Sequence, residues 1–295
     1  MKRSLRALLE SAIDYAGTFP PARLELEAAA RSYARYRAGP HAWMLGRLIV
    51  PAAKLDDLEA FLPVPGAAAG GAWPLSVILS PDPGADLERI EAFERRNEGT
   101  ARVASLEAPP LAPARIREAA SVMPAGPERF FEVPLAAGLE ERIEAVAAAG
   151  AAAKVRTGGL REDAFPGAAD LALFLAGCRR VGIPFKATSG LHHPIRGAHP
   201  ADTAPESPVA VMHGYLNLAV AASLIHAGEA GAGEAVEALE ERSVEAFRFD
   251  DDALEWRGRR LDLAGIARAR SRFFRSFGAC SFEEPVEGLE RSGLP

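Results

Sequence analysis

Short apolar runs alternate along this chain with longer amphipathic segments rich in alanine and arginine. Apolar runs with a two-residue period indicate strands, and longer segments with a period near 3.6 residues indicate helices. The pattern predicts strands at residues 11–16, 47–51, 75–80, 102–107, 129–134, 152–157, 183–188 and 244–249. It predicts helices at residues 22–37, 54–62, 85–97, 112–121, 137–149, 166–181, 211–227 and 261–275.

The order of these elements predicts the fold. A strand followed by a helix favours a parallel sheet, and about eight such units in 295 residues favour a closed barrel. Pro20-Pro21 before the first helix and Pro166 in the sixth are typical of helix starts, and Gly150 and Gly182 are typical of helix ends. We therefore predict one domain, a (β/α)8 barrel of TIM type, over residues 1–295. The alternative is an open doubly wound sheet, although no Gly-rich phosphate motif opens an early helix.

Two connections in this pattern are unusual. Residues 64–73, rich in alanine and glycine, are expected to form a flexible loop between a helix and a strand. Residues 189–210 carry three histidines and are expected to form a long irregular loop after the seventh strand. Active sites of these barrels form at the carboxyl ends of the strands, so we expect this long loop to belong to the site.

Composition narrows the class of protein. A net charge of −6 argues against nucleic acid or an anionic membrane as a partner, and no run of eighteen apolar residues predicts a transmembrane helix. The first residues lack the apolar core of a signal peptide. Cys178 and Cys280 are too few for a disulfide framework, and we interpret Cys280 as structural. We expect a cytosolic protein with a small-molecule partner, and the Ala-rich helices leave room for a homo-oligomer.

The sixth and seventh predicted strands each end in a polar motif. Residues two apart in a strand share a face, so Lys154 lies with Arg156 and Lys186 lies with Thr188. Phe185, on the opposite face, suits the side that packs against helices. The lysines are therefore expected to point into the barrel.

The same reasoning places two glutamates on the inner face. Glu107 and Glu132 fall at the ends of the fourth and fifth strands, next to the strands that carry the lysines. Ionised groups are costly to bury unpaired, so the four side chains must compensate one another, be solvated or be functional. One interpretation is a buried ion-pair network that only closes the barrel. The other is an active site, because catalytic groups usually lie at these strand ends.

Lysine is rare in this chain, which directs attention to these two positions. Of 34 basic residues only Lys2, Lys54, Lys154 and Lys186 are lysines. A lysine amine can lose its proton, whereas arginine stays charged. A lysine beside another cation in a partly desolvated pocket can attack a carbonyl as the neutral amine.

The two lysines begin the sequence motifs Lys154-Val-Arg-Thr-Gly-Gly159 and Lys186-Ala-Thr-Ser-Gly190. It resembles class I aldolases of the deoxyribose-phosphate aldolase type, which carry Lys-Thr-x-Thr-Gly on one strand and Lys-x-x-Gly-Gly on the next. The resemblance implies that Lys154 forms a Schiff base and that Lys186 is the cation favouring its neutral amine. It covers about forty of the 295 residues. Arg156 and the His-rich segment after Gly190 have no counterpart there, which leaves the substrate open.

These observations predict a lyase of class I aldolase type, without a cofactor, acting on a small anionic carbonyl compound. Glu107, Glu132 and His192 are the candidates for proton transfer. Arg156 and Arg196 are expected to bind the carboxylate or phosphate of the substrate. The remaining predicted binding residues are Thr157, Gly158, Gly159, Thr188, Ser189, Gly190, His193, His213, Asn217, Asp14 and Tyr15. Among these, His213 and Asn217 are expected to share a helix face, and Asp14 and Tyr15 end the first strand.

Two other functions remain open from the residues alone. A metal-dependent hydrolase or isomerase would bind a divalent metal such as zinc through a set of histidines and glutamates. That set would be drawn from His192, His193, His213, Glu107 and Glu132. A non-catalytic barrel would bind a small anion or serve as an assembly subunit.

Overall fold

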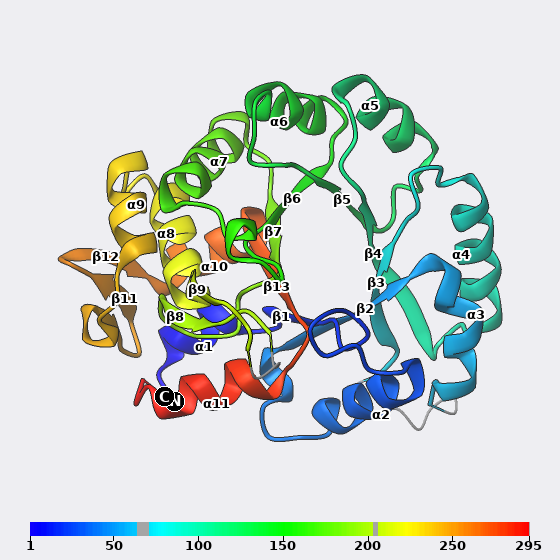
Figure 1. Ribbon diagram of the computed structural model, residues 1–295, viewed down its shortest axis with the longest axis horizontal. Helices are drawn as coiled ribbons and strands as arrows, with labels where there is room; N and C mark the ends of the chain where they lie inside the picture. The colour runs from blue at the N-terminus through cyan, green and yellow to red at the C-terminus, as the bar shows by residue number, and fades with distance from the viewer. Residues whose placement is uncertain (64–70, 203–205, 295) are drawn as a thin grey trace.

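The computed structural model describes residues 1–63, 71–202 and 206–294, and within them eight parallel strands close into a barrel (Figure 1). Going round the barrel, the strand order is β1-β13-β7-β6-β5-β4-β3-β2. The strands are β1 (Ile13–Tyr15), β2 (Leu45–Pro51), β3 (Trp73–Ile78), β4 (Ala101–Ala108), β5 (Glu128–Glu132), β6 (Ala152–Arg156), β7 (Phe185–Thr188) and β13 (Phe274–Ala279). The predicted TIM-type barrel is confirmed, and the open doubly wound sheet is wrong.

Helices surround this barrel on its outer side (Figure 1). They are α2 (Leu26–Arg37), α3 (Leu55–Leu58), α4 (Gly84–Arg96), α5 (Pro113–Val122), α6 (Leu139–Ala148), α7 (Ala168–Val181), α8 (Tyr215–Ala227) and α10 (Leu263–Arg272). The sequence pattern did not predict α1 (Arg3–Leu9), α9 (Ala232–Glu240) and α11 (Glu283–Arg291). No helix among the described residues is both long and apolar enough to cross a membrane.

The eighth strand was predicted in the wrong place. Residues 244–249 contain β10 (Phe247–Phe249), which joins β11 (Ala253–Trp256) and β12 (Arg259–Asp262) in a separate antiparallel sheet. The barrel closes instead through β13, whose residues were assigned to the end of a helix and a loop. No glycine or proline separates α10 from β13, so the amphipathic pattern runs on past the end of the helix.

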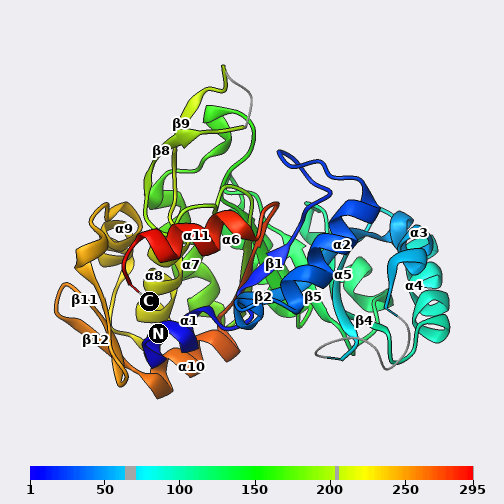
Figure 2. The same cartoon turned by 90° about the horizontal axis from the view of Figure 1, so that it is seen from below.

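The segment after β7 is more regular than expected. It contains an antiparallel hairpin, β8 (Gly197–Pro200) with β9 (Val209–Met212), which projects beyond the end of the barrel (Figure 2). Because β9 occupies the start of the helix predicted at 211–227, α8 begins only at Tyr215. Of the loop expected at 64–73, residues 64–70 lie outside the described residues, and Trp73 begins β3.

The predicted C-terminal ends of the helices agree with the structure better than the predicted N-terminal starts. Gly150 and Gly182 both adopt positive φ after α6 and α7, as C-terminal caps do. However, α2 begins at Leu26 and α7 at Ala168, so the prolines lie before the first turn of each helix. The helix predicted at 54–62 is reduced to the single turn of α3 between two short 3-10 segments.

The space between the barrel and its helices is filled by apolar side chains. Phe185 on β7 is fully buried, and its ring packs edge-on against Phe174 of α7 and against Phe273. Val155 on the neighbouring strand is also fully buried. The alternation in β6 and β7 therefore directs these residues outward, which leaves the lysines for the barrel interior.

Replacing Phe185 by alanine is expected to lower the free energy of unfolding by about 3–5 kcal/mol, because it removes a ring from this aromatic cluster and leaves a cavity. Denaturant unfolding of the purified protein measures the change. The matched control is Leu173→Ala in α7, where the leucine is 57% exposed and the expected change is within about 0.5 kcal/mol. Equal losses in the two variants would contradict the packing described here.

Candidate active site

A cavity of about 430 Å³ opens at the carboxyl ends of the barrel strands. Nine of the predicted residues line it, namely Glu107, Glu132, Lys154, Arg156, Gly159, Thr188, Ser189, Gly190 and His192. Its apolar wall includes Phe19, Ile49, Leu160, Phe165 and Met212. The predicted strand-end residues therefore come together, and the size and mixed lining are those of a small-molecule site.

Glu107 is the central group below this cavity. Its carboxylate accepts from Lys186 Nζ at 2.6 Å and from Lys154 Nζ at 3.2 Å. Ser76 Oγ donates to the same carboxylate at 2.6 Å, so Ser105, 2.6 Å away, must donate to Ser76. Burial raises the pKa of Glu107, but the two lysines and these hydrogen bonds outweigh it and hold the pKa well below its ordinary range.

Lys186 lies beneath the cavity and has no exposed surface. Its ammonium also donates to Asp14 Oδ2 at 2.6 Å, and Ser276 donates to the same oxygen. Burial opposes the charge of Lys186, but the carboxylates of Asp14 and Glu107 outweigh it and raise the pKa of the lysine. Lys186 is thus a permanently charged group under the site.

Asp14 reaches this position because of a small neighbour. Its Oδ1 accepts from the backbone N–H of Arg47, and a Cβ at Gly46 would lie only 2.5 Å from that oxygen. A side chain at position 46 would therefore displace the carboxylate from Lys186.

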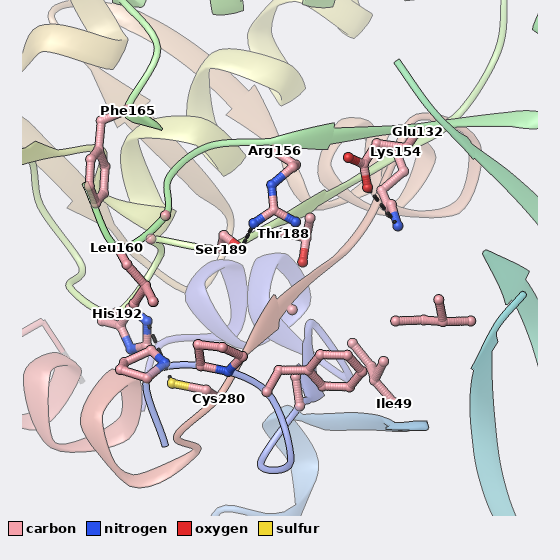
Figure 3. A pocket seen from close by; sticks show the side chains of 18 of the residues that line it. Ile49, Glu132, Lys154, Arg156, Leu160, Phe165, Thr188, Ser189, His192 and Cys280 are labelled. Atoms are coloured by element: carbon pink, nitrogen blue, oxygen red, sulfur yellow. Dashed lines mark hydrogen bonds and ion pairs between the residues drawn. The ribbon is translucent and has the colours of Figure 1, made fainter. Parts of the chain in front are cut away.

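Lys154 lies at the edge of the cavity, one strand away from Lys186. The two residues are paired in the register of β6 and β7, and Glu132 on β5 is paired with Lys154. Glu132 Oε2 lies 3.0 Å from Lys154 Nζ, and Figure 3 marks the contact between the two side chains. The lysine side chain is 6% exposed, so its amine is accessible only from the cavity. It therefore has a proton acceptor on each side.

A further layer of charge lies in the barrel. Glu128 forms ion pairs with Arg47 and Arg275. Together with the upper groups, this gives four carboxylates and four cations, which balance: Asp14, Glu107, Glu128 and Glu132 against Lys154, Lys186, Arg47 and Arg275. The interpretation as an ion-pair network is thus correct for the barrel interior, and the network also continues to the cavity.

Arg156 stands above this balanced set, at the wall of the cavity. Its side chain donates to Ser189 Oγ at 3.1 Å, and it makes no ion pair with any residue that the structure describes (Figure 3). A guanidinium without a carboxylate partner leaves its donors available to an anionic ligand.

Two glycine-containing loops shape the wall beside Arg156. Thr157 Oγ1 donates to the carbonyl oxygen of Ser189, which ties the β6 loop to the β7 loop. A Cβ at Gly158 would lie 2.9 Å from Gly190 Cα, so only glycine allows the two loops to approach this closely. Thr157 and Gly158 are therefore structural neighbours of the cavity, whereas Gly159 and Gly190 line it.

Three of the predicted binding residues, Arg196, His213 and Asn217, do not line the cavity. His213 precedes α8 instead of lying on it, so it shares no helix face with Asn217. Its Nδ1 accepts from Arg196 and its Nε2 donates to the carbonyl oxygen of Pro166. Asn217 accepts from the backbone N–H of Arg196 and donates to two carbonyl oxygens, those of Ala238 and Glu241. These groups hold the loop together, and none of the three predicted residues lines the cavity.

Two other predicted residues also lie away from the cavity lining. Tyr15 follows Asp14 in β1 and therefore points to the opposite face, where its ring stacks on that of Tyr33. Neighbouring residues in a strand alternate between its two faces, so Asp14 and Tyr15 do not point the same way. His193 stacks on His199 with 3.4 Å between ring centroids.

The geometry does not favour the metal-dependent alternative. Within residues 1–63, 71–202 and 206–294, no three histidine, cysteine or acidic side chains are grouped so that they could hold a metal ion. Both ring nitrogens of His213 are engaged, and His193 is directed at another histidine. His193 and His213 are therefore engaged in contacts of their own, whereas both glutamates contact Lys154.

Sequence reasoning missed a group on the other side of the cavity. Cys280 directly follows β13 and lies 3.9 Å from His192 Nε2, while His192 Nδ1 lies 2.6 Å from Glu284 Oε2. The misplaced eighth strand concealed this group, because Cys280 marks the strand end where catalytic residues are expected. A correct placement of β13 in the sequence analysis would have identified Cys280 as a candidate residue at the end of a barrel strand.

Comparison with models of known protein families and with curated proteins finds no match for this chain. The likeness to class I aldolases therefore depends on the strand-end motifs alone.

His213 is expected to make stability depend on pH. Burial, together with the charge of Arg196, lowers the pKa of His213 to about 4 from its ordinary value of 6.5. As the pH falls below 6.5, His213 becomes protonated in the unfolded chain but stays neutral in the folded chain until about pH 4. The free energy of unfolding therefore falls over this interval. Relative to His213→Asn, the wild type should lose about 2–3 kcal/mol more between pH 7 and pH 4 in denaturant unfolding. Identical losses in the two proteins would show that His213 does not titrate in this way.

Proposed function

We propose that this barrel is a lyase that cleaves or forms a carbon–carbon bond in a small anionic carbonyl compound through a Schiff base on Lys154. The observation that carries the proposal is the arrangement of Lys154, which reaches the cavity between two carboxylates while Lys186 stays charged beneath it. Lys154 is therefore a lysine that a substrate carbonyl can reach, with a carboxylate beside it that can accept its proton.

Charge explains why Lys154 rather than Lys186 is the nucleophile. Lys186 is enclosed by Asp14 and Glu107, its pKa is raised, and it does not line the cavity. Glu107 is shared between the two lysines, and each lysine has a second carboxylate partner, Asp14 for Lys186 and Glu132 for Lys154. Lys186 is therefore held as a charged neighbour, and Lys154 is the lysine that a carbonyl compound in the cavity can reach.

Glu132 is placed to receive that proton. From the ammonium of Lys154 the proton passes to the Glu132 carboxylate, 3.0 Å away. The neutral amine then attacks the substrate carbonyl to form a carbinolamine. Glu132 returns the proton to the hydroxyl group, which leaves as water and gives an iminium ion.

The same carboxylate serves the bond cleavage. Glu132 takes the proton of the hydroxyl group β to the iminium carbon, the carbon–carbon bond breaks, and an aldehyde departs. The electron pair of that bond is stored as an enamine on Lys154. Protonation of the enamine carbon and hydrolysis by water release the second carbonyl product and free the lysine.

Arg156 determines the class of substrate in this proposal. The guanidinium has no carboxylate partner among the described side chains and lies two residues beyond Lys154 on the same face of β6. A carboxylate or phosphate on the substrate would bind there through paired hydrogen bonds. The cavity volume of about 430 Å³ suits a compound of a few carbon atoms.

Borohydride trapping tests the covalent step. The protein is incubated with small aldehydes and keto acids, reduced, digested and analysed by peptide mass spectrometry. We expect a reduced adduct on Lys154 that disappears in Lys154→Arg, because arginine retains the charge but cannot form an imine.

Lys54 provides the matched control, since it is a lysine on the surface paired with Asp57. Lys54→Arg should leave trapping unchanged. If adducts instead form on Lys54 and Lys154 alike, or on neither with any carbonyl compound, the Schiff-base proposal fails.

Arg156→Ala tests the anion site. Loss of a charged hydrogen-bonding partner should raise the carbonyl concentration that half-saturates trapping about 10- to 100-fold for a keto acid. The value for a neutral aldehyde should stay the same. An equal rise for both compounds would show that Arg156 shapes the cavity without binding the anion.

A further inference from the structure

The cavity has a second wall with reactive side chains. It carries a thiol and an imidazole, whereas the lysine wall carries Lys154 and Arg156. Cys280 directly follows β13, and His192 lies in the connection that follows β7. Because β13 and β7 are neighbours in the barrel, their carboxyl ends bring the thiol and the imidazole together. Both side chains line the cavity, and Figure 3 shows them apart from Lys154 and Glu132.

Three side chains are connected here. His192 Nε2 lies 3.9 Å from Cys280 Sγ, and His192 Nδ1 lies 2.6 Å from Glu284 Oε2 in the first turn of α11. We call these three residues the thiol relay. A nucleophile beside a base that is itself oriented by a third group is the arrangement that enzymes use for nucleophilic catalysis.

The charge state of the imidazole suits this role. Burial opposes protonation of His192, but its contacts with Cys280 and Glu284 outweigh burial and raise the pKa to about 10. The contact with His192 lowers the pKa of Glu284. At neutral pH the ring is therefore an imidazolium held by a carboxylate, with its Nε2 facing the sulfur of Cys280.

The other cysteine shows what a structural thiol looks like in this chain. Cys178 on α7 is fully buried in the apolar layer, and burial raises its pKa. It does not line the cavity, whereas Cys280 does.

We propose that Cys280, His192 and Glu284 form a second catalytic centre of this cavity, one that hydrolyses small acyl esters or thioesters through an acyl-cysteine intermediate. The occupant is a small acyl compound because the cavity is enclosed on this side by apolar residues, among them Leu160, Phe165 and Met212. This activity needs neither Lys154 nor a Schiff base, so it stands or falls separately from the lyase proposal.

The reaction balances without any further reagent. The Cys280 thiolate attacks the acyl carbon, a carbon–sulfur bond forms, and the bond to the leaving alcohol or thiol breaks. The imidazolium of His192 gives its proton to that leaving group. Neutral His192 then takes a proton from water, the resulting hydroxide attacks the acyl-cysteine, and the carboxylic acid leaves with restoration of the thiolate and the imidazolium. Glu284 is a positioning residue that orients the ring throughout.

The first experiment uses the full chain and p-nitrophenyl acetate. We expect a rapid release of p-nitrophenolate, followed by slower turnover, and an acetyl group that peptide mass spectrometry places on Cys280. Neutral hydroxylamine should remove this group, because it cleaves a thioester and leaves an acetylated lysine intact. Acetylation confined to lysines or to the N-terminus would overturn the proposal.

Variants separate catalysis from packing. Cys280→Ser and His192→Asn are each expected to reduce ester turnover about 100-fold or more, the usual contribution of such groups. Cys178→Ser is the matched control and should retain the wild-type rate. Glu284→Gln should lower kcat with little change in KM, because it acts on ring orientation alone. Wild-type turnover in Cys280→Ser, with its unfolding curve unchanged, would refute the relay.

Alkylation of the unmodified protein keeps the test independent of variants that misfold. Iodoacetamide under native conditions should label Cys280, spare Cys178 and abolish ester turnover. Complete labelling of Cys280 without loss of turnover would contradict the proposal.

Discussion

The carboxylate of Glu107, shared by two lysine side chains inside the barrel, is the contact on which the site depends. An ionised carboxylate with almost no exposed surface is stable only when its charge is matched and its lone pairs are used. Lys186, Lys154 and Ser76 supply these partners from three different strands. Loss of either lysine would remove a cationic partner from Glu107, and loss of Ser76 would remove a hydrogen bond to it. The network therefore restricts how β3, β4, β6 and β7 can be placed relative to one another.

This network also divides the barrel into a structural part and a chemical part. Below Glu107 the charges are paired with one another. Above it, Lys154 has a single open side, towards the cavity, and Arg156 has no carboxylate partner among the described residues. A balanced interior thus supports a cationic rim, which is the electrostatic basis for proposing an anionic substrate.

The long connection from β7 to β13 builds the rest of the cavity. It contributes the β8–β9 hairpin, His192 and Met212 before the chain returns to the barrel, and Cys280 follows directly after that return. Most of these residues are separated widely in sequence and meet only because β13 lies beside β7. One wall of the cavity therefore carries amine and guanidinium groups, and another carries the thiol relay.

The alternation of residues within single strands was sufficient to predict the lysine wall. Lys154, Lys186, Glu107 and Glu132 were placed correctly because side-chain parity is a local property of extended backbone. The repeated strand–helix pattern was sufficient for the barrel itself. Parity separates Tyr15 from Asp14, and the prediction that grouped the two residues did not use it. His213 lies in a turn before α8, which the helix pattern concealed.

What the sequence determined by itself was therefore the fold and the inner faces of four consecutive strands, since both follow from short-range periodicity. The tertiary structure alone decided which strand closes the barrel, since β10 pairs with β11 in a separate sheet whereas β13 pairs with β7 and β1. It also decided that Asp14 joins Lys186 from a strand 172 residues away, and that Cys280 meets His192 across 88 residues. Contacts at such separations depend on the closure of the whole sheet, and no local pattern records them.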